Sequence, residues 1–211
     1  MTQGGPASLV DEIRQYIRKE VAAGFLDARE IEESAVDCFM NELKKGQLEP
    51  AMLRRIAGVE TDKAFAEQLD AQQKWPAVTD CDRLDQAFAD LDRSGIVARQ
   101  NFTCCQNCGH AEIGEEIDTA EQAGTDVIGY AFFHLQNTGA AVETGNLYLY
   151  YGAMADGEDA AVRIGRAIVE ALEQRGLRVD WNGERSTAIR VKLQWRRRVS
   201  PRMAERDTGM H

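Results

Sequence analysis

Residues 127–136 of this 211-residue chain read Val-Ile-Gly-Tyr-Ala-Phe-Phe-His-Leu-Gln, and residues 147–151 read Leu-Tyr-Leu-Tyr-Tyr. Both stretches are rich in aromatic and β-branched residues, which are typical of strands in a half-buried sheet. A connection containing Gly and Thr separates them and indicates a long hairpin loop. We therefore expect two antiparallel neighbouring strands in the second half of the chain.

The flanking sequence predicts the other elements of a sheet domain. Apolar residues recur with helical spacing from Ala160 to Leu172, within a helix expected at 156–175, and Gly176 follows as a stop. Another helix is expected around Ile113 and Ile117. The order from residue 96 is then β-α-β-β-α-β-β in a mixed or antiparallel sheet, for which a ferredoxin-like arrangement is one candidate. The remaining strands are expected at 96–103, 177–181 and 188–195.

The first 94 residues predict a helical lobe. Apolar residues recur at three- and four-residue spacing up to Gly24, and Asp27 with Glu30 resembles a capping box that opens a second helix ending at Gly46. Pro50 suits the start of a short third helix, and Thr61 the cap of a fourth. A fifth, amphipathic helix is expected to begin at Asp80. The predicted α+β organisation is a helical lobe at 1–94, a sheet domain at 95–196 and a basic tail at 197–211, with lobe and sheet expected to form one structural unit.

Composition and charge restrict the partners. The net charge of −10 is uneven, because residues 160–211 carry 12 Lys/Arg against 6 Asp/Glu while residues 1–159 carry 13 against 29. So acidic a chain is not expected to bind nucleic acid, although the arginines at 196–198, 202 and 206 can contact a phosphate backbone or an acidic neighbour. The acidic helical lobe is expected to contact a protein partner.

The sequence also bears on the compartment. We expect no membrane span and no signal peptide, because no apolar run approaches the length that a span requires and residues 1–6 lack a basic-then-apolar pattern. Five cysteines are an odd number and favour free thiols over a disulfide framework. The expected location is the cytoplasm.

The chemically most unusual segment is Cys104-Cys105-Gln106-Asn107-Cys108-Gly109-His110. Its C-x-x-C-G pattern resembles half of a metal knuckle, in which the glycine lets backbone amides turn toward the thiolates. A closed zinc site needs four ligands and no second C-x-x-C pair occurs, so His110 or His134 would have to complete the set. The predicted ligands for zinc or iron are Cys104, Cys105, Cys108, His110 and His134.

Two other interpretations of the cysteines stay open. A thiol pair between a strand and a helix N-terminus is typical of dithiol redox proteins, because the helix dipole lowers a thiol pKa there. Nearby glutamates, including Glu112, and the lack of any proline from 77 to 200 argue against a thioredoxin-like site. Alternatively, the cysteines are small hydrophobic residues packed at a strand-to-helix corner.

A second candidate site surrounds His134. Strand alternation would place His134 and Gln136 on one face of the sheet, and polar residues of the following loop and strand would converge there. No motif of a common catalytic class occurs, so an enzyme is not indicated. The predicted pocket residues are His134, Gln136, Glu143, Asn146 and Tyr148.

Three segments carry a resemblance to a known family. They are Asn-Phe-Thr-Cys-Cys-Gln-Asn-Cys-Gly at 101–109, Gly-Tyr-Ala-Phe-Phe-His at 129–134, and Gly-Asn-Leu-Tyr-Leu-Tyr-Tyr-Gly at 145–152. Together they resemble an uncharacterised bacterial domain family of unknown function. The resemblance implies one domain family over most of the chain and a bacterial cytoplasmic setting, and brings no catalytic residue or ligand. The expected function is therefore that of a binding or regulatory protein, with a metalloprotein or a dithiol redox protein as alternatives.

Overall fold

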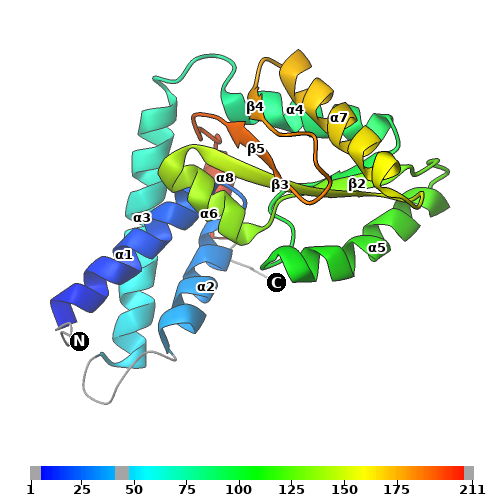
Figure 1. The fold of residues 1–211 in the computed structure, drawn as a ribbon. Coiled ribbons are helices and arrows are strands. Elements are labelled where there is room, and N and C mark those ends of the chain that lie inside the picture. Colours follow the sequence, from blue (N-terminus) through cyan, green and yellow to red (C-terminus); the bar gives the residue numbers. More distant parts are fainter. Residues whose placement is uncertain (1–5, 41–47, 207–211) are drawn as a thin grey trace. The chain divides into compact units, whose positions relative to one another are not determined.

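The computed structural model of the protein describes residues 6–40 and 48–206 (Figure 1). Within these ranges it is an α+β protein with eight helices and one five-stranded mixed sheet, which confirms the predicted fold class. The chain divides into two compact units. We call residues 1–76 with 196–211 the helical unit, and residues 77–195 the sheet unit.

The helical unit contains α1 (Pro6–Ala23), α2 (Ala28–Met40), α3 (Pro50–Gln72) and the short α8 (Pro201–Ala204). The predicted capping box is confirmed, because the amide of Asp27 donates to Glu30 Oε2 at 2.8 Å and the amide of Glu30 donates to Asp27 Oδ1 at 2.9 Å. The predicted end of this second helix at Gly46 lies outside the described residues. The prediction of two helices after Pro50 is wrong, since Thr61 is a fully buried residue inside the continuous α3 and not a cap.

Residues 196–206, which include part of the predicted basic tail, belong to the helical unit and pack within it. Val199 is 2% exposed, and its carbonyl accepts a 2.9 Å hydrogen bond from the side chain of Gln72. Arg206 pairs with Glu32 and, at 2.7 Å, with Asp62. Arg206, one of the arginines of the basic segment, therefore has acidic neighbours within the chain itself.

The sheet unit runs through α4 (Asp80–Arg93), β1 (Ile96–Arg99), α5 (Gln106–Gln122), β2 (Gly129–Phe132), α6 (Leu135–Thr144), β3 (Asn146–Ala153), α7 (Glu158–Gln174), β4 (Arg178–Asp180) and β5 (Ile189–Lys192). The strand order is β1-β2-β3-β5-β4. β1 and β2 are parallel, and every other pair is antiparallel. The predicted antiparallel pairing of the two aromatic strands is thus confirmed.

Two details of the predicted topology are wrong. The segment between the aromatic strands is the helix α6, which ends at the left-handed Gly145, and not a hairpin loop. A split βαβ unit would place another strand between β1 and β2, whereas here they are hydrogen-bonded neighbours. The sheet is therefore not ferredoxin-like.

Helices cover both faces of the sheet (Figure 1). Two successive residues at the end of β2 contact helices on opposite faces. Phe133, just after β2, meets Phe88 of α4 with ring centroids 5.7 Å apart, whereas Phe132 contacts Gly109 of α5. α4 and α7 pack together and cover one face, while α5 covers β1 and β2 on the other. α4 consequently belongs to the sheet unit, and the compact units divide after Pro76 and not at the expected residue 94.

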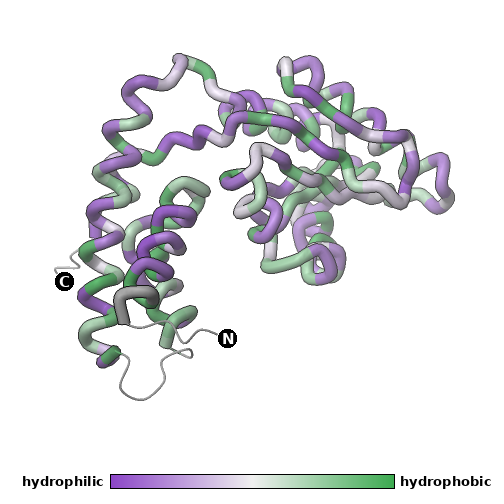
Figure 2. Tube along the Cα trace, turned by 60° about the vertical axis from the view of Figure 1, so that its left-hand side comes forward, coloured by the Kyte–Doolittle hydropathy of each residue, from purple (hydrophilic) through white to green (hydrophobic). Residues whose placement is uncertain are grey.

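Figure 2 shows hydrophilic and hydrophobic residues alternating along the helices, as expected for helices with one buried stripe. α4 is the amphipathic helix predicted to begin at Asp80, and its apolar residues Leu84, Phe88 and Leu91 are buried. Among the described residues, no helix combines the length and the apolar character that crossing a membrane requires.

Candidate metal centre

The cysteine cluster lies where the parallel strands β1 and β2 end and the helices α5 and α6 begin. The loop after β1 is tied to the start of α6 by backbone hydrogen bonds: the Phe102 amide donates to the Phe133 carbonyl at 2.8 Å, and the Leu135 amide donates to the Thr103 carbonyl at 3.2 Å. The hydroxyl of Thr138 also donates to Asn101 Oδ1 at 2.7 Å. The loop that presents the cysteines is therefore held at several points.

The same loop contains two non-glycine residues in the left-handed backbone region. Asn101 has a φ of 52° and Thr103 a φ of 57°. Asparagine tolerates this conformation, but a β-branched threonine does so at a cost of roughly 1–3 kcal/mol. Such strain is typical of functional sites. Here it reverses the chain immediately before Cys104, so that Cys104 lies close to the first turn of α5.

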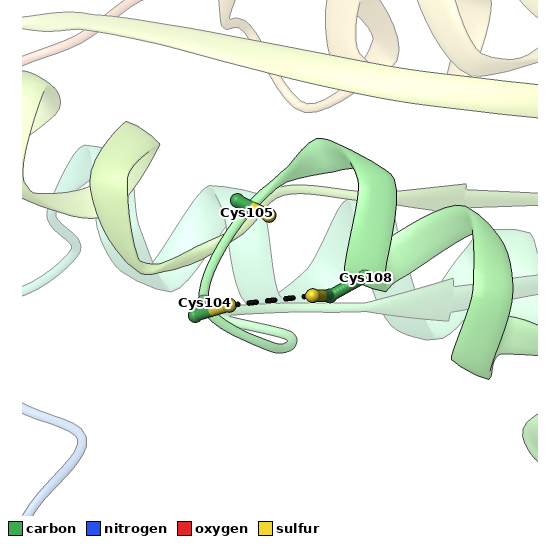
Figure 3. A group of neighbouring side chains, drawn as sticks. All are labelled: Cys104, Cys105 and Cys108. Carbon is green, nitrogen blue, oxygen red and sulfur yellow. Dashed lines mark hydrogen bonds between the residues drawn. The ribbon is translucent and has the colours of Figure 1, made fainter.

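Three sulfur atoms come together in this corner. Cys104 lies in the loop, Cys105 is the N-cap of α5 and Cys108 is in its first turn (Figure 3). The three Sγ atoms lie within 4.8 Å of one another, and those of Cys104 and Cys108 are 3.4 Å apart. A tetrahedral zinc with bonds of about 2.3 Å to sulfur separates its ligands by about 3.8 Å. The spacing therefore suits one thiophilic metal ion.

The helix start distinguishes the thiols electrostatically. The backbone amide of Cys108, followed by the thiols of Cys108 and Cys104, directs hydrogen bonds at the sulfur of Cys105 and lowers its pKa. Hydrogen bonding of the Cys108 thiol to Cys104 and Cys105 raises the pKa of Cys108 to about 12. Cys105 thus forms its thiolate at a lower pH than Cys108, and hydrogen bonds from Cys104 and Cys108 stabilise that thiolate.

Gly109 has a different role from the one its position in C-x-x-C-G suggests. It is an ordinary residue of α5, and its amide donates to the Cys105 carbonyl at 2.9 Å. A Cβ atom at this position would lie 2.2 Å from Cε2 of Phe132. The glycine therefore permits close approach of helix and sheet, and the interpretation as a turn-forming knuckle glycine is wrong.

Neither candidate histidine joins the three sulfur atoms. His110 Nδ1 lies 3.1 Å from the hydroxyl of Tyr130, and the ring packs edge-on against Phe132. His134 is 5% exposed, stacks on Tyr150 at 5.5 Å, and leaves Nδ1 without a hydrogen-bond partner among the described residues. Burial lowers the pKa of both histidines. The group that can hold a metal consists of Cys104, Cys105 and Cys108.

The five predicted pocket residues do not share one cavity. His134 is buried at the N-cap of α6, whereas Gln136 and Glu143 are exposed on that helix. The prediction that Gln136 shares a strand face with His134 is wrong, because the strand ends before it. Tyr148 is 37% exposed on β3. Asn146, at the start of β3, lines a cavity of about 430 Å³ that contains none of the other four.

Sequence reasoning missed the polar residues that support the loop. Asn137 accepts the amide of His134 at 3.2 Å, and Thr138 bonds Asn101, both from the first turn of α6. A signal for this helix exists, because an amide residue at the third helical position and a glycine after the last are typical of helix ends. The aromatic pattern on both sides concealed it.

The fold and the site define an α+β protein that presents a three-cysteine cluster at the carboxyl end of a parallel strand pair. The chain belongs to a family described as a domain of unknown function, DUF6891, whose model matches residues 6–199. This match confirms the resemblance to a family of unknown function. Searches of curated proteins and of solved structures returned no match.

Proposed function

We propose that this domain is a metal-binding protein that holds a thiophilic ion, zinc in the first place, with Cys104, Cys105 and Cys108. The main support for this proposal is the proximity of the three sulfur atoms, which all lie within 4.8 Å of one another. Thiolate ligands favour Zn²⁺ or Cu⁺ over hard cations such as Mg²⁺. The strained, well-anchored loop adds support, since it places the first cysteine beside the other two.

Three protein ligands give an open site. Structural zinc is almost always held by four protein ligands, whereas sites with three keep a position for water or an incoming group. Cys104 is exposed, so the fourth position is accessible from solvent. This arrangement supports the expected binding or regulatory role, in which an external ligand or a partner's side chain completes the coordination. The abundance of free thiols favours the cytoplasm as the compartment.

The test is elemental analysis of the full chain purified under reducing conditions without added metal. We expect about one zinc per chain, and the combined substitution Cys105→Ser and Cys108→Ser should reduce it to background. Cys38→Ser is the matched control, because Cys38 is also a free cysteine but lies on α2, outside the cluster. If wild-type protein contains no metal and does not take up Zn²⁺ or Cu⁺ in titrations, the proposal fails.

One observation favours dithiol redox chemistry as a second candidate function. The 3.4 Å between the sulfur atoms of Cys104 and Cys108 exceeds a disulfide bond by only about 1.4 Å, and Cys105 beside them has a lowered pKa. Against a thioredoxin-like mechanism, no proline occurs between Pro76 and Pro201. Mass spectrometry of metal-free protein equilibrated in glutathione buffers measures it directly: a loss of two hydrogens at physiological potentials supports this candidate, and stable thiols exclude it.

A further inference from the structure

The cavity that Asn146 lines is at the opposite end of β3 from the part that pairs with β2. Its wall is formed by the turn between α6 and β3, the turn between α7 and β4, the end of β5 and the first turn of α4, and its volume is about 430 Å³. These elements surround the end of the sheet where β3, β5 and β4 lie side by side (Figure 1). The metal centre contributes no residue to it.

The cavity wall carries an excess of positive charge. Its ionisable residues are Arg83, Arg178, Lys192 and Asp80, a formal charge of +2. The sheet unit as a whole has 10 Lys/Arg against 19 Asp/Glu over residues 77–195, a formal charge of −9. The positive charge of the cavity wall is therefore opposite in sign to the charge of the unit as a whole.

Asp80, the single acidic residue of the cavity wall, already has partners for both of its carboxylate oxygens. One carboxylate oxygen of Asp80 pairs with Arg83 at 2.8 Å, and the other accepts the backbone amide of Gln194 at 2.8 Å. It therefore offers little to the other two cations. Among the described residues, the side chains of Arg178 and Lys192 make no hydrogen bond or close ion pair, and Lys192 acts on Asp180 only through a longer-range electrostatic attraction.

These two cations are direct cross-strand partners. Arg178 on β4 is in register with Lys192 on β5, which is in register with Asn146 on β3. Two positions further along the same strands, Asp180 pairs with Arg190 and balances its charge. Like charges directly opposite each other destabilise a sheet, so the first row lacks the counter-charge that the second row has.

We propose that this cavity binds a small organic anion, with a phosphate or carboxylate group between Arg178 and Lys192. Guanidinium binds either group through two parallel hydrogen bonds, and the ammonium adds a mobile point charge. The volume exceeds that of one oxyanion, and Leu177 and Leu193 supply apolar walls for a carbon skeleton. The charge of −9 on the unit opposes a polyanion such as nucleic acid.

The experiment is isothermal titration calorimetry of the metal-free full chain with inorganic phosphate and, separately, with succinate, at constant ionic strength. Saturable binding of either anion is expected, and the tighter one identifies the group. The double variant Arg178→Gln and Lys192→Gln should weaken it at least tenfold. Arg163→Gln with Arg166→Gln removes the same charge from α7, outside the cavity, and should bind like wild type.

Thermal unfolding without anion serves as the check on folding. Because the double variant removes a like-charge pair, its Tm should equal or exceed that of wild type. If it unfolds early, the single variant Arg178→Gln replaces it and should still weaken binding severalfold. The proposal is overturned if neither anion binds saturably to wild type, or if the α7 control loses affinity to the same extent as the cavity variant.

Discussion

Replacing Gly109 with alanine is expected to lower the free energy of unfolding of the sheet unit by roughly 1–2 kcal/mol and to weaken metal binding. The new methyl carbon would lie 2.2 Å from Cε2 of Phe132, whose side chain is fully buried and packs against the rings of Phe102 and Tyr150. Overpacking of this kind costs about 1–3 kcal/mol, of which the higher helix propensity of alanine returns up to about 1. An outward shift of the first turn of α5 would relieve this clash, and that turn carries Cys108.

Gly114 provides the matched control on the same helix. It is exposed, and a Cβ atom there meets nothing within 4 Å. Gly114→Ala should therefore raise stability by about 0.5–1 kcal/mol, since alanine is the better helix former. Urea unfolding followed by near-ultraviolet circular dichroism measures both variants, and zinc titration measures the shift of the cysteines. Equal stability of the two variants would contradict the close contact between α5 and β2.

The elements that the sequence predicted well are those with strong, local patterns. α4 and α7 have wide apolar stripes and a glycine just beyond their ends, so their positions follow from residues within the helix. α6 was missed because its buried residues are Asn137, Thr138, Gly139 and Ala141, which carry little apolar signal. Its burial depends on hydrogen bonds to the β1–α5 loop, and such bonds leave no periodicity in the sequence.

How the helices and strands pack together depends on contacts between residues far apart in the sequence. The stripe of α4 shows that one face is buried, but only the pairing of Phe88 with Phe133 shows that it packs on the sheet. Likewise, the C-x-x-C spacing identifies Cys105 and Cys108 as neighbours on one helix turn, whereas the approach of Cys104 depends on the left-handed Thr103. Histidine is frequent among metal ligands, yet the aromatic side chains of β2 and β3 hold both candidate rings.

Cys105 and Cys108 are expected to react at very different rates in metal-free protein. Backbone and thiol hydrogen bonds lower the pKa of Cys105, while the pKa of Cys108 is raised to about 12. Each pKa unit changes the thiolate population tenfold below the pKa, so at neutral pH Cys105 should be thiolate far more often than Cys108. Because the thiolate is the nucleophile, alkylation by iodoacetamide should be much faster at Cys105 than at Cys108.

The pH dependence has a definite sign. Since a lowered pKa shifts thiolate formation to lower pH, the alkylation rate of Cys105 should rise with a midpoint on the acid side of an ordinary cysteine, and that of Cys108 should still be rising above pH 11. Peptide mass spectrometry after short exposures resolves each site. Substituting Cys108→Ala removes the side-chain hydrogen bond but keeps the backbone amide, so the midpoint of Cys105 should move only part of the way back.

Saturation with zinc should abolish this selectivity, because a metal bound by all three sulfur atoms holds each of them as thiolate and shields it. Binding at neutral pH should then release the protons that the three thiols still carry, and affinity should fall as pH falls. A profile in which the three cysteines alkylate at similar rates, with or without zinc, would show that the start of α5 does not activate Cys105 and that the three sulfur atoms do not act as one site.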